Sequence, residues 1–241
     1  MSKDGRVVLL APEHFGATNS WGQPVVGWVP NSQGIGGLHN PRGYGLVRVV
    51  LQKLVDGAMQ FLYDQPIIVE NAGSIVLAQL GDRVGLVQNF RMVGDRLLPD
   101  AGAEYIKRLQ EERLWSKLLE TLGRWHWEAP RGLAPSSKRD DEDFESFVLR
   151  TAKLEALEEA GLGIEKARIV GRVNANPTFF PHAQYVVHAQ IASVGDAVPE
   201  NLEIIGNMHL FTRQELRRLN DAGEFDDGLT LAALALCEFV F

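Results

Sequence analysis

The sequence predicts an α/β fold, and three observations carry this prediction. Apolar, β-branched runs separated by short turns recur along the chain, as in strands that pair within a sheet. Residues 154–162 combine helix-forming side chains with a cluster of carboxylates. The chain has 241 residues, of which 45% are hydrophobic. A chain of this size can bury about 70% of its unfolded surface in one large domain, or in a domain with an N-terminal extension.

The first 70 residues are expected to form an extension that contains strands. Residues 6–10 form a short apolar run, and a Gly- and Pro-rich stretch that includes residues 34–37 follows it. A glycine cluster with no strand before it and no helix after it is weak evidence for a phosphate loop, so we interpret this stretch as an irregular arm. Residues 45–54 and 58–69 are apolar and β-branched around a short turn, which predicts an antiparallel strand pair.

Residues 71–241 are expected to form the main domain. Residues 74–80 and 84–90 flank a Gly-Asp turn and predict a second strand pair. Residues 169–173 and 185–192 predict further strands of a buried sheet. A helical insertion is expected over about residues 93–124, with an amphipathic helix of up to five turns at 101–122. This helix either extends the core or forms a lid or a partner-contacting surface.

Three glutamates, Glu155, Glu158 and Glu159, form an acidic stripe on the predicted helix. Spacings of three and four residues place them within an arc of about 100°. No Lys or Arg lies three or four residues from any of them. A solvated acidic face usually interleaves cations, whereas clustered carboxylates without a cation suit Mg²⁺ or Mn²⁺. Apolar residues on both sides of the stripe, Leu154 among them, predict a helix clasped between two layers.

Four segments carry recognisable motifs along the chain. Gln88-Asn-Phe-Arg91 ends an apolar run, and Trp127-Glu-Ala-Pro-Arg-Gly132 follows it. Glu155-Ala-Leu-Glu-Glu-Ala-Gly-Leu162 comes next, and the last segment joins Glu215-Leu216 to Gly223-Glu-Phe-Asp-Asp-Gly-Leu-Thr-Leu-Ala-Ala-Leu234. Together these segments resemble the ADP-ribose pyrophosphatase branch of the Nudix hydrolases, over about residues 44–241. The resemblance implies a Nudix-type α/β/α sandwich with a mixed sheet, an N-terminal strand extension and an inserted helix.

The chain departs from the Nudix signature before the acidic helix. The loop between Gly132 and the helix is eight residues longer than in the signature, with the extra residues placed within 135–143. Ser146 occupies the position of the early signature Glu. Glu145 and Glu142 are the nearby residues that would substitute for it.

Two further departures concern the catalytic groups. The signature Arg beside the first helical Glu is Leu154 here. Where many members of the branch place a catalytic Glu in a later loop, this chain offers Gln184 and His182. We therefore expect the metal site to be retained and leave the general base open.

The resemblance implies hydrolysis of the pyrophosphate bond in a nucleoside diphosphate linked to another group, such as ADP-ribose or a nucleotide sugar. Mg²⁺ or Mn²⁺ held by carboxylates would offset phosphate charge and activate a water. The implied metal ligands are Glu155, Glu159, Glu158 (directly or through water) and the main-chain carbonyl of Arg131; the candidate catalytic residues are the three glutamates and Glu145. The candidate substrate-binding residues are Arg91 for phosphate or the terminal sugar, Trp127 or Phe180 for base stacking, Glu128 and Gln184.

Composition limits the partners. The net charge of −7, without a Lys/Arg block, argues against nucleic acid and anionic membranes as partners, and leaves a small nucleotide substrate. The single cysteine, Cys237, excludes an internal disulfide and fits a reducing compartment. The apolar runs at 7–11 and 229–241 are too short for a signal peptide or a membrane span. We expect a cytoplasmic protein, and the resemblance implies a homodimer that pairs through the N-terminal extension.

Other chemistries find no support in the sequence. The six histidines show no zinc-site spacing, and no nucleophile elbow or P-loop is present. Two alternatives to a hydrolase remain. One is a catalytically impaired Nudix-fold module that binds nucleotides or regulates, as the degenerate signature would allow. The other is a structural dimer whose acidic stripe is simply solvated.

Overall fold

The computed structural model describes residues 5–9, 28–29, 44–55, 58–69, 73–91, 103–114, 123–133, 141–180, 183–199 and 204–240. The chain divides into two compact units. The first comprises Met1–Ser74, Leu133–Thr151 and Gly171–Tyr185, and the second Ile75–Gly132, Ala152–Val170 and Val186–Phe241. The first unit thus joins the N-terminal extension to two later segments. The glycines of 34–37, most of the lengthened loop and His182 lie outside the described residues.

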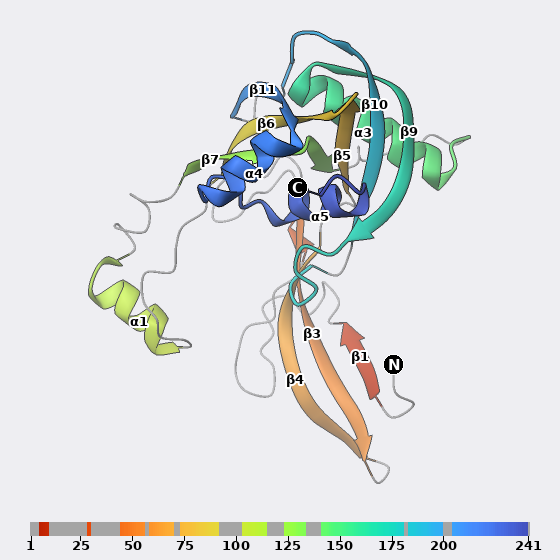
Figure 1. Cartoon of the computed structure of the whole chain (residues 1–241). Helices are drawn as coiled ribbons and strands as arrows, with labels where there is room; N and C mark the ends of the chain where they lie inside the picture. The colour runs from red at the N-terminus through yellow and green to blue at the C-terminus, as the bar shows by residue number, and fades with distance from the viewer. Residues whose placement is uncertain are drawn as a thin grey trace. The chain divides into compact units, whose positions relative to one another are not determined.

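A four-stranded antiparallel sheet belongs to the first unit. It contains β1 (Gly5–Leu9), β2 (Trp28–Val29), β3 (Tyr44–Val55) and β4 (Ala58–Val69). The order is β1-β3-β2, and β4 also pairs with β3. Figure 1 shows β3 and β4 as a long ribbon. Their pairing places Val55 opposite Ala58, so the predicted strand pair is confirmed.

A seven-stranded mixed sheet forms the centre of the second unit. Its main path is β11-β6-β5-β10-β9, with β7 paired to β6 and β8 to β5. The strands are β5 (Gly73–Leu80), β6 (Arg83–Arg91), β7 (Arg124–Glu128), β8 (Arg131–Leu133), β9 (Leu162–Val173), β10 (Gln184–Val194) and β11 (Ile205–Thr212). The predicted hairpin of β5 and β6 is confirmed, and Gly81 adopts a φ of 61° at its turn.

The core of this unit surrounds the centre of the sheet. Consecutive residues of β5, from Ile75 to Ala78, are all fully buried, although they point alternately to the two faces. A strand buried on both faces needs a continuous apolar run, and the sequence supplies one here. The sheet therefore gives a rigid base from which the ends of β6 and β7 project polar side chains.

Helix α3 (Phe144–Ala160) carries the acidic stripe in its last two turns. Asp143 begins it, since its carboxylate accepts a hydrogen bond of 2.7 Å from the Ser146 N–H. Gly161, with a φ of 65°, ends it, and the chain enters β9 at once. For this reason β9 starts at Leu162, well before the predicted residue 169.

The prediction that α3 is clasped between two apolar layers is wrong. Its buried apolar residues recur at a spacing of four, namely Val148, Ala152, Ala156 and Ala160, and the buried Thr151 and Glu159 lie on the same side. Leu154 and Leu157 lie away from this side and are 39% and 50% exposed. The small alanine side chains allow α3 to pack closely on one side, while Leu154 and Leu157 face solvent.

Two helices with N-terminal caps, α4 and α5, follow the last strand of the sheet. Helix α4 (Arg213–Asp221) starts with a capping box in which Thr212 and Glu215 bond each other's backbone N–H groups. Helix α5 (Gly228–Leu236) starts at Asp227, whose carboxylate accepts from the Thr230 N–H. In the insertion, the structure describes one helix, α1 (Ala103–Glu111), where up to five turns were predicted; residues 115–122 lie outside the described part.

Candidate active site

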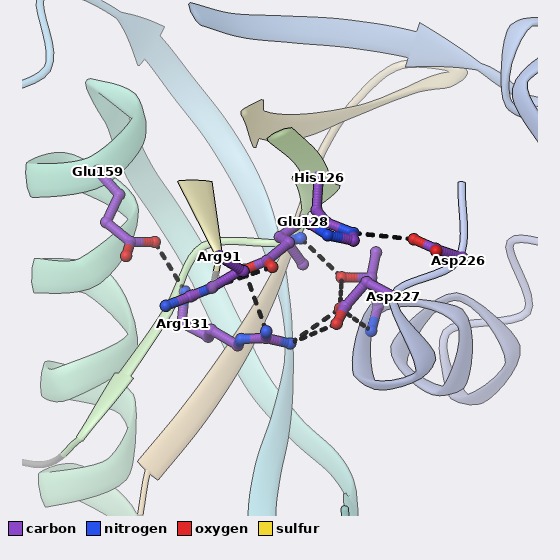
Figure 2. Close-up of polar contacts among 9 residues, drawn as sticks. Arg91, His126, Glu128, Arg131, Glu159, Asp226 and Asp227 are labelled. Atoms are coloured by element: carbon purple, nitrogen blue, oxygen red, sulfur yellow. Dashed lines mark hydrogen bonds and ion pairs between the residues drawn. The ribbon is translucent and has the colours of Figure 1, made fainter. Parts of the chain in front are cut away.

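Two glutamates of α3 converge on one short backbone segment. Glu159, only 2% exposed, accepts a hydrogen bond of 2.9 Å at Oε2 from the Arg131 N–H (Figure 2). Glu155, one turn earlier on the helix, places its carboxylate directly against Gly132, where any Cβ would collide with it. The position of the Glu155 carboxylate against residue 132 therefore depends on glycine there.

Glu158, the third member of the stripe, is half-buried on the same helix. Its main-chain carbonyl accepts from the Val198 N–H at 2.9 Å, which ties the end of α3 to the segment after β10. Within the described residues, no three His, Cys, Asp or Glu side chains gather closely enough to form a metal-binding group. The structure thus brings Glu155 and Glu159 to one backbone segment, and Glu158 stands beside them on the helix.

Glu128 links two arginines next to these carboxylates. It is 2% exposed and receives a bidentate interaction from Arg91, whose Nη2 lies 2.7 Å from Oε2. The Arg131 Nη2 lies 3.1 Å from the same oxygen. A buried carboxylate needs such partners, because an isolated charge away from water is strongly unfavourable. Arg91, predicted to bind substrate, is thus held by Glu128 while its side chain stays 38% exposed.

Asp227 extends the network to the C-terminal helix. Its carboxylate binds the Arg131 Nη1 at 2.8 and 3.0 Å and also accepts from the Thr230 N–H and hydroxyl. The Thr230 hydroxyl oxygen accepts in turn from the Ala129 N–H at 2.8 Å. These bonds, drawn in Figure 2, connect the start of α5 to residues 128–131. The sequence motif contained Asp227 and Thr230, but their role in orienting Arg131 was not inferred.

A second polar pair borders this network. The His126 Nδ1 lies 2.9 Å from an Asp226 carboxylate oxygen, and the His126 side chain is 12% exposed. Sequence reasoning treated His126 as one histidine among six and missed this pair. The only available signal was the alternation of β7, which puts His126 and Glu128 on one face of the strand.

Trp127 points to the other face of β7. It packs edge-to-face on Phe211, with ring centroids 4.8 Å apart, and also contacts His209 of β11. Successive side chains of a strand point in opposite directions, so Trp127 is separated from Glu128 by the sheet itself. The structure therefore does not bring Trp127 together with the Arg91–Glu128 pair.

The remaining predicted site residues belong to the first unit, so the site described here is built without them. Glu145 is exposed in the first turn of α3, and the ten residues to Glu155 correspond to a rise of about 15 Å along the helix. Glu142, its alternative, forms a bidentate pair with Arg150 at 2.8 Å. Phe180 and Gln184 are half-buried, the first in a turn and the second at the start of β10.

Comparisons with known proteins identify the fold. No family model and no curated protein matches the sequence. Among solved structures, the chain is similar to the crystal structure of an ADP compounds hydrolase, with 13% identity, a TM-score of 0.50, and coverage of 80% of this chain and 84% of that one. A NUDIX hydrolase from Nitrosomonas europaea matches 70% of this chain and 88% of its own, with 13% identity and a TM-score of 0.44. The chain shares its fold with the ADP compounds hydrolase, and the α/β class predicted from the sequence is confirmed.

Proposed function

We propose that the protein hydrolyses the pyrophosphate bond of a nucleoside diphosphate linked to another group, of the ADP-ribose or nucleotide-sugar class, with Mg²⁺ or Mn²⁺. The convergence of Glu155 and Glu159 on residues 131–132 carries this proposal. It brings the motif at residues 127–132 next to the acidic motif at residues 155–162, although the two lie far apart in the sequence.

The residues present fit a divalent ion. Glu155 and Glu159, with Glu158 directly or through water, would hold it, because carboxylate oxygens are the ligands that Mg²⁺ and Mn²⁺ prefer. Because Gly132 has no Cβ, the Glu155 carboxylate occupies the space that a Cβ would fill. When bound, the ion would offset charge on the phosphate oxygens and activate a water.

The chain's own cations complete the site. Arg91 and Arg131 lie on one buried carboxylate, so neither guanidinium needs to be ordered when an anionic substrate arrives. Arg91 is the more exposed of the two, at 38% against 15%, and is the proposed contact for a substrate phosphate. Glu128 and Asp227 orient these arginines.

The test is a substrate panel assayed with Mg²⁺, with Mn²⁺ and with EDTA, measuring the release of nucleoside monophosphate. At least one of ADP-ribose, nucleotide sugars, dinucleoside polyphosphates and nucleotide cofactors should be split only with metal. Glu159→Gln should lower that activity about a hundredfold or more, the scale for loss of a preorganised electrostatic group. Glu104→Gln, on an exposed position of α1, removes the same charge and should leave the activity unchanged.

A catalytically impaired binding module is the second candidate. The observations in its favour are the exposed Leu154 in place of the signature Arg and Ser146 in place of the early Glu. Metal-dependent binding of a nucleotide without any turnover would favour the module over the hydrolase. Full turnover in Glu159→Gln would contradict the site itself.

A further inference from the structure

A separate polar cavity opens in the second unit, between β5, β9 and β10. Its volume is about 480 Å³, within the usual range for small-molecule sites. Lys166 and Arg168 line it from β9, together with His188, Gln79 and Gln190. The lining residues that the structure describes include two basic side chains and no carboxylate. Such a surface attracts anions.

The pairing register places this cavity on the opposite face of the sheet from the carboxylate site. Gln79 pairs with Val84, and Glu128 pairs with Val87 on the same strand. Directly paired residues share a face, and positions 84 and 87 of a strand point in opposite directions. Gln79 therefore lies on the other side of the sheet from Glu128, and the cavity is not part of the proposed active site.

Hydrogen bonds fix the polar groups of the cavity. The Gln79 Nε2 donates to the Gly81 carbonyl at 2.7 Å, which directs the Gln79 Oε1 toward the His188 Nε2, 2.8 Å away. An amide oxygen only accepts, so His188 must carry its proton on Nε2. The ring is thereby held in one orientation beside the cations.

From this geometry we infer that the cavity binds a small molecule through a phosphate group, held between Lys166 and Arg168. The volume exceeds what a lone ion needs, and the amides of Gln79 and Gln190 add polar groups for the rest of the molecule. Arg168 presents a planar fork that matches phosphate geometry, while Lys166 supplies a second positive charge. The inference does not depend on the proposed hydrolysis.

His188 provides a reporter for this binding. Burial, and secondarily the positive charge of Arg168, lower the pKa of His188 below its ordinary value of 6.5. A phosphate beside Arg168 would offset that charge and favour the imidazolium form. The pKa of His188 should therefore rise when the cavity is filled.

The experiment is a titration of the intact protein with inorganic phosphate and with pyrophosphate, in EDTA and at constant ionic strength. The His188 imidazole resonances, identified by their loss in His188→Gln, are followed by NMR. We expect saturable shifts and a higher His188 pKa, weakened at least tenfold in Arg168→Gln and also weakened in Lys166→Gln. Arg172→Gln, an exposed position further along β9, should bind within twofold of the parent.

The controls separate this site from the active site. Glu159→Gln should leave the titration unchanged, whatever its effect on hydrolysis. The inference is overturned if phosphate gives no saturable shift, or if folded Arg168→Gln binds as tightly as the parent. Equal binding of acetate would also overturn it, because the cavity would then take carboxylates as well as phosphates.

Discussion

The Arg131 N–H donates to the buried carboxylate of Glu159 at 2.9 Å, and this bond links the acidic helix α3 to the backbone at the start of β8. Because the donor is a backbone group, the bond requires a particular path of the chain and not a particular side chain at position 131. The Arg131 side chain is left to bind Glu128 and Asp227. One residue thus connects α3, the sheet and α5.

Gly132→Ala should separate function from stability. The added Cβ would collide with the Glu155 carboxylate, which is the end of a flexible side chain and can move aside without displacing the backbone. We expect the free energy of unfolding to change by less than about 1 kcal/mol. Metal-dependent activity should fall about a hundredfold, the usual effect of a displaced catalytic group.

The matched control is Gly228→Ala, at the first residue of α5, where a Cβ meets no atom within 4 Å. Alanine favours the helix there, so stability should hold or rise slightly and activity should persist. Both variants are compared by urea unfolding and by turnover. Equal activity in the parent and in Gly132→Ala would remove Glu155 from the proposed site.

Leu154→Arg restores the arginine of the Nudix signature. Leu154 is 39% exposed, so the new charge remains in water and the free energy of unfolding should change by no more than about 0.5 kcal/mol. An arginine beside Glu155 should steady that carboxylate and raise the turnover number. A loss of more than about 1 kcal/mol in a denaturant titration would show that Leu154 packs against the protein after all.

Local patterns in the sequence were sufficient for most of the fold. The hairpin of β5 and β6 was predicted from two apolar runs around a Gly-Asp turn, because strand pairing across a short turn is a local property. The start of β9 was missed because the residues after Gly161 lack the apolar pattern of a buried strand, and all residues of β9 except Leu162 are exposed or partly exposed. β9 lies at the end of the strand order of its sheet, and this position depends on tertiary structure, which the local sequence does not encode.

The candidate site was predicted only where the motif itself names the residue. Glu155 and Glu159 were found, because spacing on a helix is visible in the sequence. Asp227 was not assigned a role, because its pairing with Arg131 joins residues 96 positions apart, and no local pattern encodes that contact. The exposure of Leu154 was missed for a related reason, since an apolar residue on a helix does not reveal which face the core covers.

Glu128→Gln should be strongly destabilising. Glu128 is 2% exposed and holds Arg91 and Arg131, and removing one partner of a buried ion pair leaves the others uncompensated. We expect a loss of about 3 kcal/mol in the free energy of unfolding, at the lower end of the usual range, because Arg91 is partly exposed and Arg131 keeps Asp227.

An exposed ion pair supplies the comparison. Glu111→Gln breaks the pair with Lys107 on α1, where both side chains are about 60% exposed, and should cost no more than about 0.5 kcal/mol. Chemical unfolding of both variants measures the difference. Similar losses in the two would contradict the structural importance of the Glu128 network.

The capping box of α4 should contribute stability that depends on pH. Hydrogen bonds from the Thr212 N–H, and secondarily from its hydroxyl, lower the pKa of Glu215 below its ordinary 4.5. As the pH falls, Glu215 is therefore protonated in the unfolded chain before it is protonated in the folded protein. Its contribution to the free energy of unfolding is present above pH 4.5 and is lost as the pH falls through the lower pKa of the folded protein. Between pH 5 and 3 the parent should lose stability more steeply than Glu215→Gln. Thr212→Ala should cost about 1 kcal/mol at pH 7, and a parent and Glu215→Gln with parallel pH profiles would argue against the box.

Cys237 should react slowly in the folded protein. Burial raises the pKa of its thiol from 9.0 to about 11, against the opposing effect of the Arg168 charge. At pH 8 the reactive thiolate is then about a hundredfold scarcer in the folded protein than in the unfolded chain, and alkylation by iodoacetamide should be slower by a similar factor.

Because the unfolded chain releases the Cys237 thiol proton near pH 9 and the folded protein does not, the free energy of unfolding should fall as the pH rises from 8 to 10.5. Cys237→Ala removes the titrating group and should weaken that dependence. A folded-state alkylation rate within tenfold of the unfolded rate, or a pH profile unchanged by Cys237→Ala, would show that the thiol is more accessible to water than its position at the end of α5 indicates.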